Sequence, residues 1–211
     1  RYDFFKLHYI NNFLFISSDF KQCSKFSIYF LMKLKLIKLS SVKSTNDEAI
    51  KLIKKNKFFP CIITAKKQTK GRGTMGKKWI SEKGNLFISL FFETNSKKIK
   101  PDKFSVLNPR IIKNVLGKYS KYKISIKWPN DLLVKKRKLC GILQEVIEHK
   151  NKKFLIIGIG INTKISPKNK SFRSTSLSAC SNRIIKNSEI LIKIKLAYER
   201  IISNLNKDKR I

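Results

Sequence analysis

Acidic residues, cysteines and histidines are all scarce in this sequence. Its 211 residues hold only 13 Asp and Glu against 48 Lys and Arg, with 4 cysteines and 2 histidines. The cysteines form no CxxC pair, so neither a zinc site nor a disulfide framework is indicated, and a reducing cytoplasm fits. The two histidines, His8 and His149, are isolated, and we assign them no catalytic role.

An uninterrupted apolar run is also lacking. Residues 1–31 are rich in aromatics, but polar and charged residues break every apolar stretch below the roughly 18 residues that a spanning helix needs. A membrane anchor remains the competing interpretation, yet we expect no membrane association. Because this segment shows neither helical nor strand periodicity, we predict that it is an extension, that Met32 is the natural start, and that residues 32–211 form one catalytic domain.

What the sequence has in excess is positive charge. The formal net charge is +35, which is typical of proteins that bind nucleic acid. Only 8 of the 48 basic residues are arginines, however, and the lysines are spread along the whole chain. Phosphate and base recognition favours the arginine fork, so we favour a chain-wide compositional bias and expect no specific DNA binding. With 42% hydrophobic residues the chain is not disordered.

Apolar periodicity predicts a mixed fold. Strands are expected at 34–39, 61–65, 86–92, 123–128, 138–147 and 154–161. Helices are expected at 47–55, opened by a capping box over residues 45–48, at 101–118 with a kink at Pro109, and at 188–204. Because consecutive strands are joined by short turns, we predict an α/β (α+β) fold with a mainly antiparallel sheet flanked by helices.

A glycine-rich basic loop at residues 70–78 matches two phosphate-binding patterns without satisfying either. The glycines Gly71, Gly73 and Gly76 have the dinucleotide spacing, but no helix is predicted after them. Lys78 stands where a phosphate-binding loop needs a Ser or Thr hydroxyl. Two interpretations of this loop remain: a basic clamp over an anionic ligand, and a solvated hairpin loop.

Two further stretches carry candidate chemistry. The run Lys127-Trp-Pro-Asn-Asp131 is followed by Lys138, and a hairpin between them brings Lys138 back towards Asp131. Such a pair can neutralise an anionic transition state and orient an amine, but it also fits a surface ion pair. In Gly158-Ile-Gly160-Ile-Asn162, glycines on one strand face indicate close approach by a ligand or simple packing.

Taken in order, these segments resemble the biotin–protein ligase family. The resemblance covers about 36–177 and includes Ser44-Thr45-Asn46, the loop from Gly71 to Trp79, the Lys-Trp-Pro-Asn-Asp run, and the strands at 138–141 and 158–162. It implies the class II aminoacyl-tRNA synthetase/biotin ligase-like fold. It also implies that ATP and Mg²⁺ convert biotin to biotinyl-adenylate, which then biotinylates a lysine of a biotin carboxyl carrier protein. We expect a cytoplasmic monomer or weak homodimer.

The resemblance also implies a role for each site residue. Catalysis is assigned to Lys138, Asp131 and Arg72, with Lys138 at the biotin carboxylate and α-phosphate and Asp131 at the incoming lysine. Biotin binding is assigned to Ser44, Thr45, Asn46, Gln68, Gly71, Arg72, Gly73, Lys138 and Gly141. Nucleotide binding is assigned to Lys77, Lys78, Trp79, Asn130 and Asn162, with the indole beside the adenine.

The sequence departs from the family at two places. Thr74 stands where an arginine is common, which removes one charge from the adenylate loop. Residues 1–31 are too short and aromatic for the helix-turn-helix of regulatory members, so we expect no repressor activity. A lipoate–protein ligase, which shares the fold type, is the nearest alternative function, and a basic nucleic-acid-binding protein is the alternative from another class.

Overall fold

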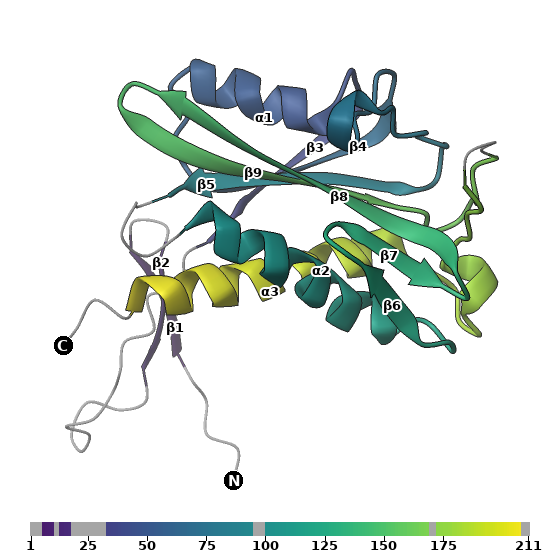
Figure 1. The fold of residues 1–211 in the computed structure, drawn as a ribbon. Coiled ribbons are helices and arrows are strands. Elements are labelled where there is room, and N and C mark those ends of the chain that lie inside the picture. The colour runs from purple at the N-terminus through teal and green to yellow at the C-terminus, as the bar shows by residue number, and fades with distance from the viewer. Residues whose placement is uncertain (1–5, 11–12, 18–32, 95–99, 169–171, 208–211) are drawn as a thin grey trace, which may run out of the picture.

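A seven-stranded sheet with helices on both faces forms the body of the protein. The computed structural model describes residues 6–10, 13–17, 33–94, 100–168 and 172–207. Helix α1 lies on one face of the sheet, and α2 and α3 lie on the other (Figure 1). Across the sheet the strands follow the order β3 (Lys35–Val42), β4 (Cys61–Gln68), β5 (Leu86–Glu93), β9 (Lys152–Ile161), β8 (Arg137–His149), β7 (Asp131–Val134) and β6 (Ile124–Lys127).

The strand pairing is antiparallel at every step except one. Strands β3 and β4 are parallel, and α1 (Thr45–Lys54) forms the crossover between them. The pairs β4–β5, β5–β9, β9–β8, β8–β7 and β7–β6 are antiparallel. The predicted mainly antiparallel sheet flanked by helices is therefore confirmed.

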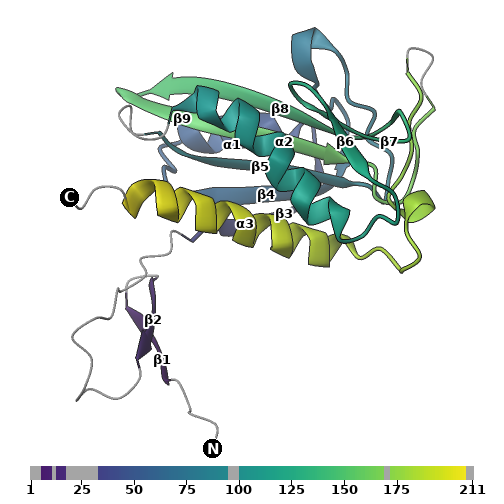
Figure 2. The ribbon, with the colours of Figure 1, turned by 60° about the horizontal axis from the view of Figure 1, so that its bottom comes forward.

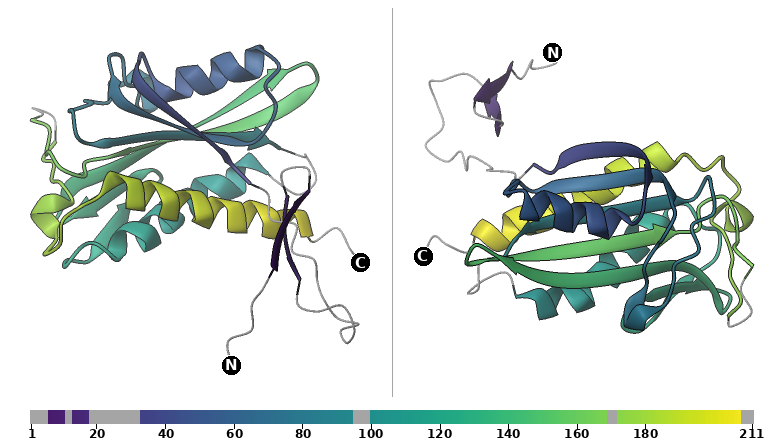
Figure 3. Two further views of the ribbon diagram at one scale, coloured as in Figure 1. Left: turned by 180° about the vertical axis from the view of Figure 1, so that it is seen from behind. Right: turned by 90° about the horizontal axis from the view of Figure 1, so that it is seen from above.

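Alternation along the strands builds one core on each face of the sheet. On β5, the residues Leu86, Ile88, Leu90 and Phe92 join the core beneath α2 (Pro101–Gly117) and α3 (Asn187–Lys207). The helices α2 and α3 pack against each other beneath the sheet (Figure 2). The opposite core, under α1, contains Ala49, Ile53, Phe91, Phe154 and Ile156. Seen from above, α1 covers only part of its face of the sheet (Figure 3).

Two local predictions differ from the structure. The capping box is wrong: the N-cap is Ser44 in extended conformation, it makes no side-chain capping hydrogen bond, and the helix begins at Thr45. The hydroxyl of Thr45 donates to Gln68 Oε1 instead, because tertiary contacts offer it a partner outside the helix.

Strand β7 was not predicted, since its four residues lie between two turns. Pro109 lies inside α2, and its predicted kink stays a prediction.

The segment before the main sheet contains two short strands that its sequence did not predict. Strand β1 (Lys6–Ile10) pairs antiparallel with β2 (Phe13–Ser17) in a separate sheet. Aromatic and β-branched residues favour strands even without clean alternation, which accounts for the difference. Met32, the predicted start of the domain, lies outside the described residues. Among the residues that are described, no helix is long and apolar enough to cross a membrane.

Candidate active site

A pocket opens where one face of the sheet changes from bulky to small side chains. Under α1 this face carries Phe91 and Ile156, whereas two residues further along the same strands it carries Ser89 and Gly158, followed by Gly160. The pocket, counted together with the open solvent at its mouth, has a volume of about 820 Å³. Of the two alternatives left open by their spacing, the structure favours packing, because a Cβ atom on Gly158 would collide with the Asn46 side chain and one on Gly160 with the Trp79 indole.

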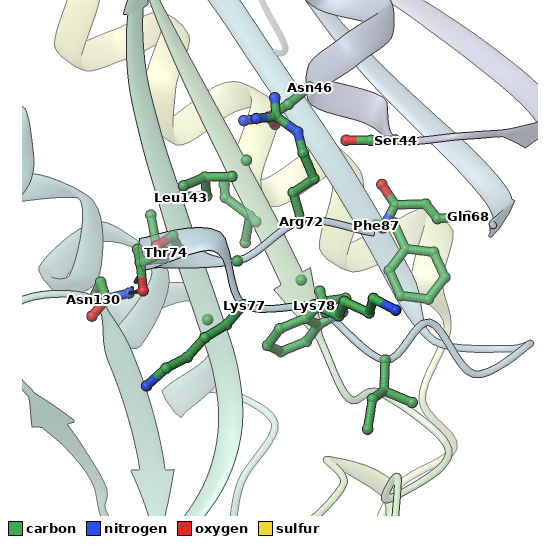
Figure 4. Close-up of a pocket in the computed structure, with 18 of the residues that line it drawn as sticks. Ser44, Asn46, Gln68, Arg72, Thr74, Lys77, Lys78, Phe87, Asn130 and Leu143 are labelled. Carbon is green, nitrogen blue, oxygen red and sulfur yellow. Dashed lines mark hydrogen bonds between the residues drawn. The ribbon is translucent and has the colours of Figure 1, made fainter. Parts of the chain in front are cut away.

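Nearly all of the predicted site residues line this one pocket (Figure 4). Those that line it are Ser44, Thr45, Asn46, Gln68, Arg72, Gly73, Lys77, Lys78, Trp79, Asn130, Asp131, Lys138, Gly141 and Asn162. The exception is Gly71, which is buried behind the wall, where a Cβ atom would lie 2.7 Å from both Ser81 Oγ and the Trp79 carbonyl oxygen. Gly71 therefore shapes the wall, and its expected contact with biotin stays a prediction.

One end of the pocket is a network of uncharged polar side chains. The backbone N–H and hydroxyl of Thr45 donate to Gln68 Oε1 at 2.8 and 3.0 Å, and Gln68 Nε2 donates to Ser81 Oγ at 3.1 Å. The hydroxyl of Ser89, fully buried on β5, contacts both Thr45 Oγ1 and Asn46 Oδ1. Because each group is held by another, the network presents preorganised donors and acceptors to a ligand.

The guanidinium of Arg72 is held by two carboxylates. It donates to both oxygens of Glu145 at 2.8 Å, and its Nε lies 3.0 Å from Asp47 Oδ1. In Figure 4 the Arg72 side chain extends towards Asn46, whereas Lys77 and Lys78 extend away from it. The charge of Arg72 is thus largely balanced, whereas Lys77 and Lys78, which also line the pocket, form no ion pair with any residue that the structure describes.

The pair of Lys138 and Asp131 lies inside the pocket and is not a surface ion pair. Lys138 Nζ is 2.7 Å from Asp131 Oδ1, and the side chains are only 19% and 17% exposed. The ammonium also lies 5.5 Å from the Trp79 ring centroid and 5.3 Å from that of Phe172. A carboxylate and two aromatic rings therefore hold one cation in a single place.

A β-bulge explains why Lys138 points into the pocket. Between β7 and β8, Leu132 is paired with Cys140 but the next residue, Leu133, is paired with Lys138, so Leu139 is an extra residue. Leu139 and Cys140 are both buried in the core under α2 and α3. An extra residue reverses the alternation of a strand, and this reversal places Lys138 on the same face as Gly141. Without it, Lys138 would point towards the core.

The indole of Trp79 lies against the two glycines of neighbouring strands. A Cβ atom on Gly160 would collide with the indole, and one on Gly141 would lie 2.7 Å from Trp79 Cζ3. Two buried polar atoms beside this slot, Trp79 Nε1 and Asn162 Oδ1, have no hydrogen-bond partner among the residues that the structure describes. A donor and an acceptor left without partners in a pocket are available to a bound molecule.

The buried cysteines are not suited to act as nucleophiles. Burial raises the pKa of the Cys140 thiol well above its usual range, and it raises that of Cys61 to about 12. Both thiols therefore stay protonated at neutral pH and are poor nucleophiles. Within the described ranges, no cluster of three His, Cys, Asp or Glu side chains is placed to hold a metal ion.

Some pocket residues were missed by sequence reasoning. Ser89 supports the polar network, and Asp47 and Glu145 form ion pairs with Arg72. The ring of Phe172 lies against the Lys138 ammonium. The polar Ser89 within the apolar run Leu86–Glu93 was a signal that could have been followed. Glu145 and Phe172 carried no such signal, because their importance depends on contacts with residues distant in the sequence.

Comparisons with known proteins agree with this geometry. The family model described as "Biotin/lipoate A/B protein ligase family" matches residues 22–162. The bifunctional ligase/repressor BirA of Bacillus spizizenii is 31% identical over 78% of this chain and 53% of its own length. The biotin–[acetyl-CoA-carboxylase] ligase of Paracoccus denitrificans is 29% identical over 61% of this chain and 55% of its own. The chain thus spans about half the length of these relatives.

A solved structure is similar over a larger share of its own chain. The biotin protein ligase of Aquifex aeolicus, in complex with biotin and ATP, has a TM-score of 0.65 and 32% sequence identity to this chain. The match covers 83% of this chain and 72% of that one.

Proposed function

Because the chain belongs to the biotin/lipoate A/B protein ligase family, we propose that it activates biotin with ATP and transfers it to a lysine of a biotin carboxyl carrier protein. The observation that carries this proposal is the partly buried pair of Lys138 and Asp131, which lies in the same pocket as the uncharged polar network. In the first step a biotin carboxylate oxygen attacks the α-phosphorus of ATP, and pyrophosphate leaves. In the second step the lysine amine attacks the acyl carbon, and AMP leaves.

The polar end of the pocket fits the ureido ring of biotin. That ring is uncharged and carries one carbonyl acceptor and two N–H donors, so it needs both kinds of partner in a buried site. Ser44, whose hydroxyl does not cap the helix, joins Thr45, Asn46 and Gln68 there, with Gly73 lining the same wall. The dithiolane ring of lipoate has no N–H donors and no carbonyl acceptor, so it could not form these hydrogen bonds. The network therefore favours biotin over lipoate.

Lys138 is placed to stabilise two anions as they approach each other. The biotin carboxylate and the α-phosphate repel each other as they approach, and a cation fixed between them offsets this repulsion. Its place between Trp79 and Phe172 needs little reorganisation during the reaction. Lys77 and Lys78 add positive charge on the loop side of the pocket.

The remaining groups are suited to the nucleotide. Trp79 offers an aromatic surface for the adenine, and the unpartnered Asn162 Oδ1 can accept a hydrogen bond from a ribose hydroxyl. Asn130 is held by its Nδ2 donating to the Ile142 carbonyl at 3.1 Å. Mg²⁺ would arrive with the ATP phosphates, which supply part of its oxygen ligands.

The proposed function is tested by biotin-dependent exchange of labelled pyrophosphate into ATP. Exchange requires that the first step run in both directions, so a protein that only binds either substrate gives none. We expect exchange with biotin and little with lipoate in its place. Exchange that depends on lipoate alone would assign the chain to the other branch of the family, and no exchange with either acid would contradict the proposal.

Replacing Trp79 with alanine is expected to raise the KM for ATP about tenfold or more and to change that for biotin much less. Stacking of a base on an aromatic side chain contributes about 1–3 kcal/mol. Steady-state exchange rates at varied ATP and biotin measure both constants. Equal effects on the two substrates would show that the indole only supports the wall of the pocket.

A second variant tests the contact between Trp79 and the glycines beneath it without removing the indole. In Gly160→Ala the new methyl group collides with Trp79, so we expect a loss of about 1–3 kcal/mol of stability from overpacking and a raised KM for ATP. The matched control is Gly117→Ala, where a Cβ atom would meet nothing within 4 Å. Denaturant unfolding of the two variants compares the costs.

A further inference from the structure

Trp128 is a large aromatic residue that the fold leaves exposed and that lies close to Asp131 in the chain. It is 51% exposed, just after β6 ends, and only two residues, Pro129 and Asn130, separate it from Asp131. The backbone beyond it is firmly held: Ile142 N donates to the Asn130 carbonyl at 2.9 Å, and Asn130 Nδ2 donates back to the Ile142 carbonyl. The indole therefore projects from a fixed turn, and exposed tryptophans in such settings are typical of interaction sites.

The neighbours of Trp128 are cations. The guanidinium of Arg110, on α2, lies 5.8 Å from the Trp128 ring centroid, and the exposed Lys127 precedes it in the chain. Lys127 is paired with Asp131 across β6 and β7, so it lies on the strand face that leads to the pocket. Within the described residues neither Arg110 nor Lys127 forms an ion pair. We call Arg110, Lys127 and Trp128 the Trp128 surface.

We propose that the Trp128 surface is where the acceptor protein docks, and that it fits an acidic protein surface with an apolar side chain close to the target lysine. This inference rests on the proposed function. A lysine has only a short four-carbon stem, so the acceptor backbone must come close to Asp131 for its amine to arrive there. The turn that carries Trp128 is the part of the chain next to that carboxylate.

Charge decides between the possible occupants of this surface. A second copy of the chain would bring another +35 of net charge against the same cations, which disfavours self-association here. An acidic carrier is attracted by the whole molecule and oriented by Arg110 and Lys127, and the apolar packing against Trp128 then slows its dissociation. A nucleic acid also carries negative charge, but it offers no amine to the pocket.

The test separates docking from chemistry. In Trp128→Ala and in Arg110→Glu we expect biotin-dependent pyrophosphate exchange to stay within about twofold of the wild type. The KM for a purified biotin carboxyl carrier domain should rise about tenfold, and transfer of biotin to hydroxylamine, which needs no docking, should not change. The matched controls on α3 are Leu196→Ala, whose leucine is 55% exposed, and Arg200→Glu. Both should leave the carrier KM unchanged.

Three outcomes would overturn the inference. An unchanged carrier KM in both variants, with normal exchange, contradicts the docking surface alone. Variants that lose affinity for single-stranded DNA but keep the carrier KM make the surface a phosphate-binding one. If the wild-type chain gives no biotin-dependent exchange, the proposed function fails and the docking surface fails with it. Thermal unfolding of each variant checks that a raised KM does not reflect a loss of fold.

Discussion

Replacing Lys138 with alanine is expected to reduce biotin-dependent pyrophosphate exchange about a hundredfold or more. The ammonium would be the charge nearest to the biotin carboxylate and the α-phosphate as they join. One charged hydrogen bond at developing negative charge contributes on the order of 3 kcal/mol to the transition state. Initial exchange rates at saturating biotin and ATP measure the effect.

A matched ion pair elsewhere in the chain controls for the loss of a salt bridge. Lys152 lies 2.8 Å from Glu93 Oε2 on the far part of the sheet, with both side chains more than two-fifths exposed. Lys152→Ala removes an ion pair of similar length and should leave exchange unchanged. Because Lys138→Ala also leaves Asp131 without its partner, unfolding curves must accompany the rates. A folded Lys138→Ala protein with normal exchange would remove Lys138 from the first step.

Replacing Asp131 with asparagine is expected to lower transfer to the carrier about a hundredfold while much of the exchange remains. The attacking lysine is protonated at neutral pH and must lose a proton before it reacts. A side chain that orients the amine or accepts this proton contributes about a hundredfold in typical cases. Asparagine keeps the shape of the side chain, and the first step needs no base for a lysine. Single-turnover transfer to a carrier domain measures the second step alone.

Supplying biotinyl-adenylate made in advance sharpens the contrast between the two variants. It bypasses the first step, so it should restore transfer substantially in Lys138→Ala and hardly at all in Asp131→Asn. The two side chains form one ion pair at 2.7 Å, so the same measurement also distinguishes separate roles from a shared one. If both folded variants lose both steps equally, the two residues support one shared geometry and have no separate roles.

Much of this protein could be predicted from its sequence because the relevant signals are local. A short, nearly continuous apolar segment such as Leu86–Glu93 is typical of a strand buried on both faces, and short turns between consecutive strands require antiparallel neighbours. The glycines Gly158 and Gly160 indicated close approach by a ligand or close packing on one strand face, and the spacing of Asp131 and Lys138 indicated a hairpin that brings them together. Each of these inferences depends on residues within one or two adjacent elements.

Other features were decided only by the tertiary structure. The partners of Arg72, which are Asp47 on α1 and Glu145 on β8, come from distant parts of the chain, and no local pattern predicts that they meet. The same holds for the indole of Trp79, which fills the space that Gly141 and Gly160 leave open.

The direction of the Lys138 side chain shows most clearly why the sequence alone could not decide these features. Strict alternation from Cys140 would point Lys138 into the core, and only the extra residue Leu139, opposite Leu132, turns it into the pocket. This bulge sets the two buried residues Leu139 and Cys140 opposite Leu132 alone, so it depends on how β7 and β8 pair in the folded sheet. By itself the sequence determined most of the strands and helices and the residues proposed to carry the chemistry, whereas contacts between distant elements decided where those residues point.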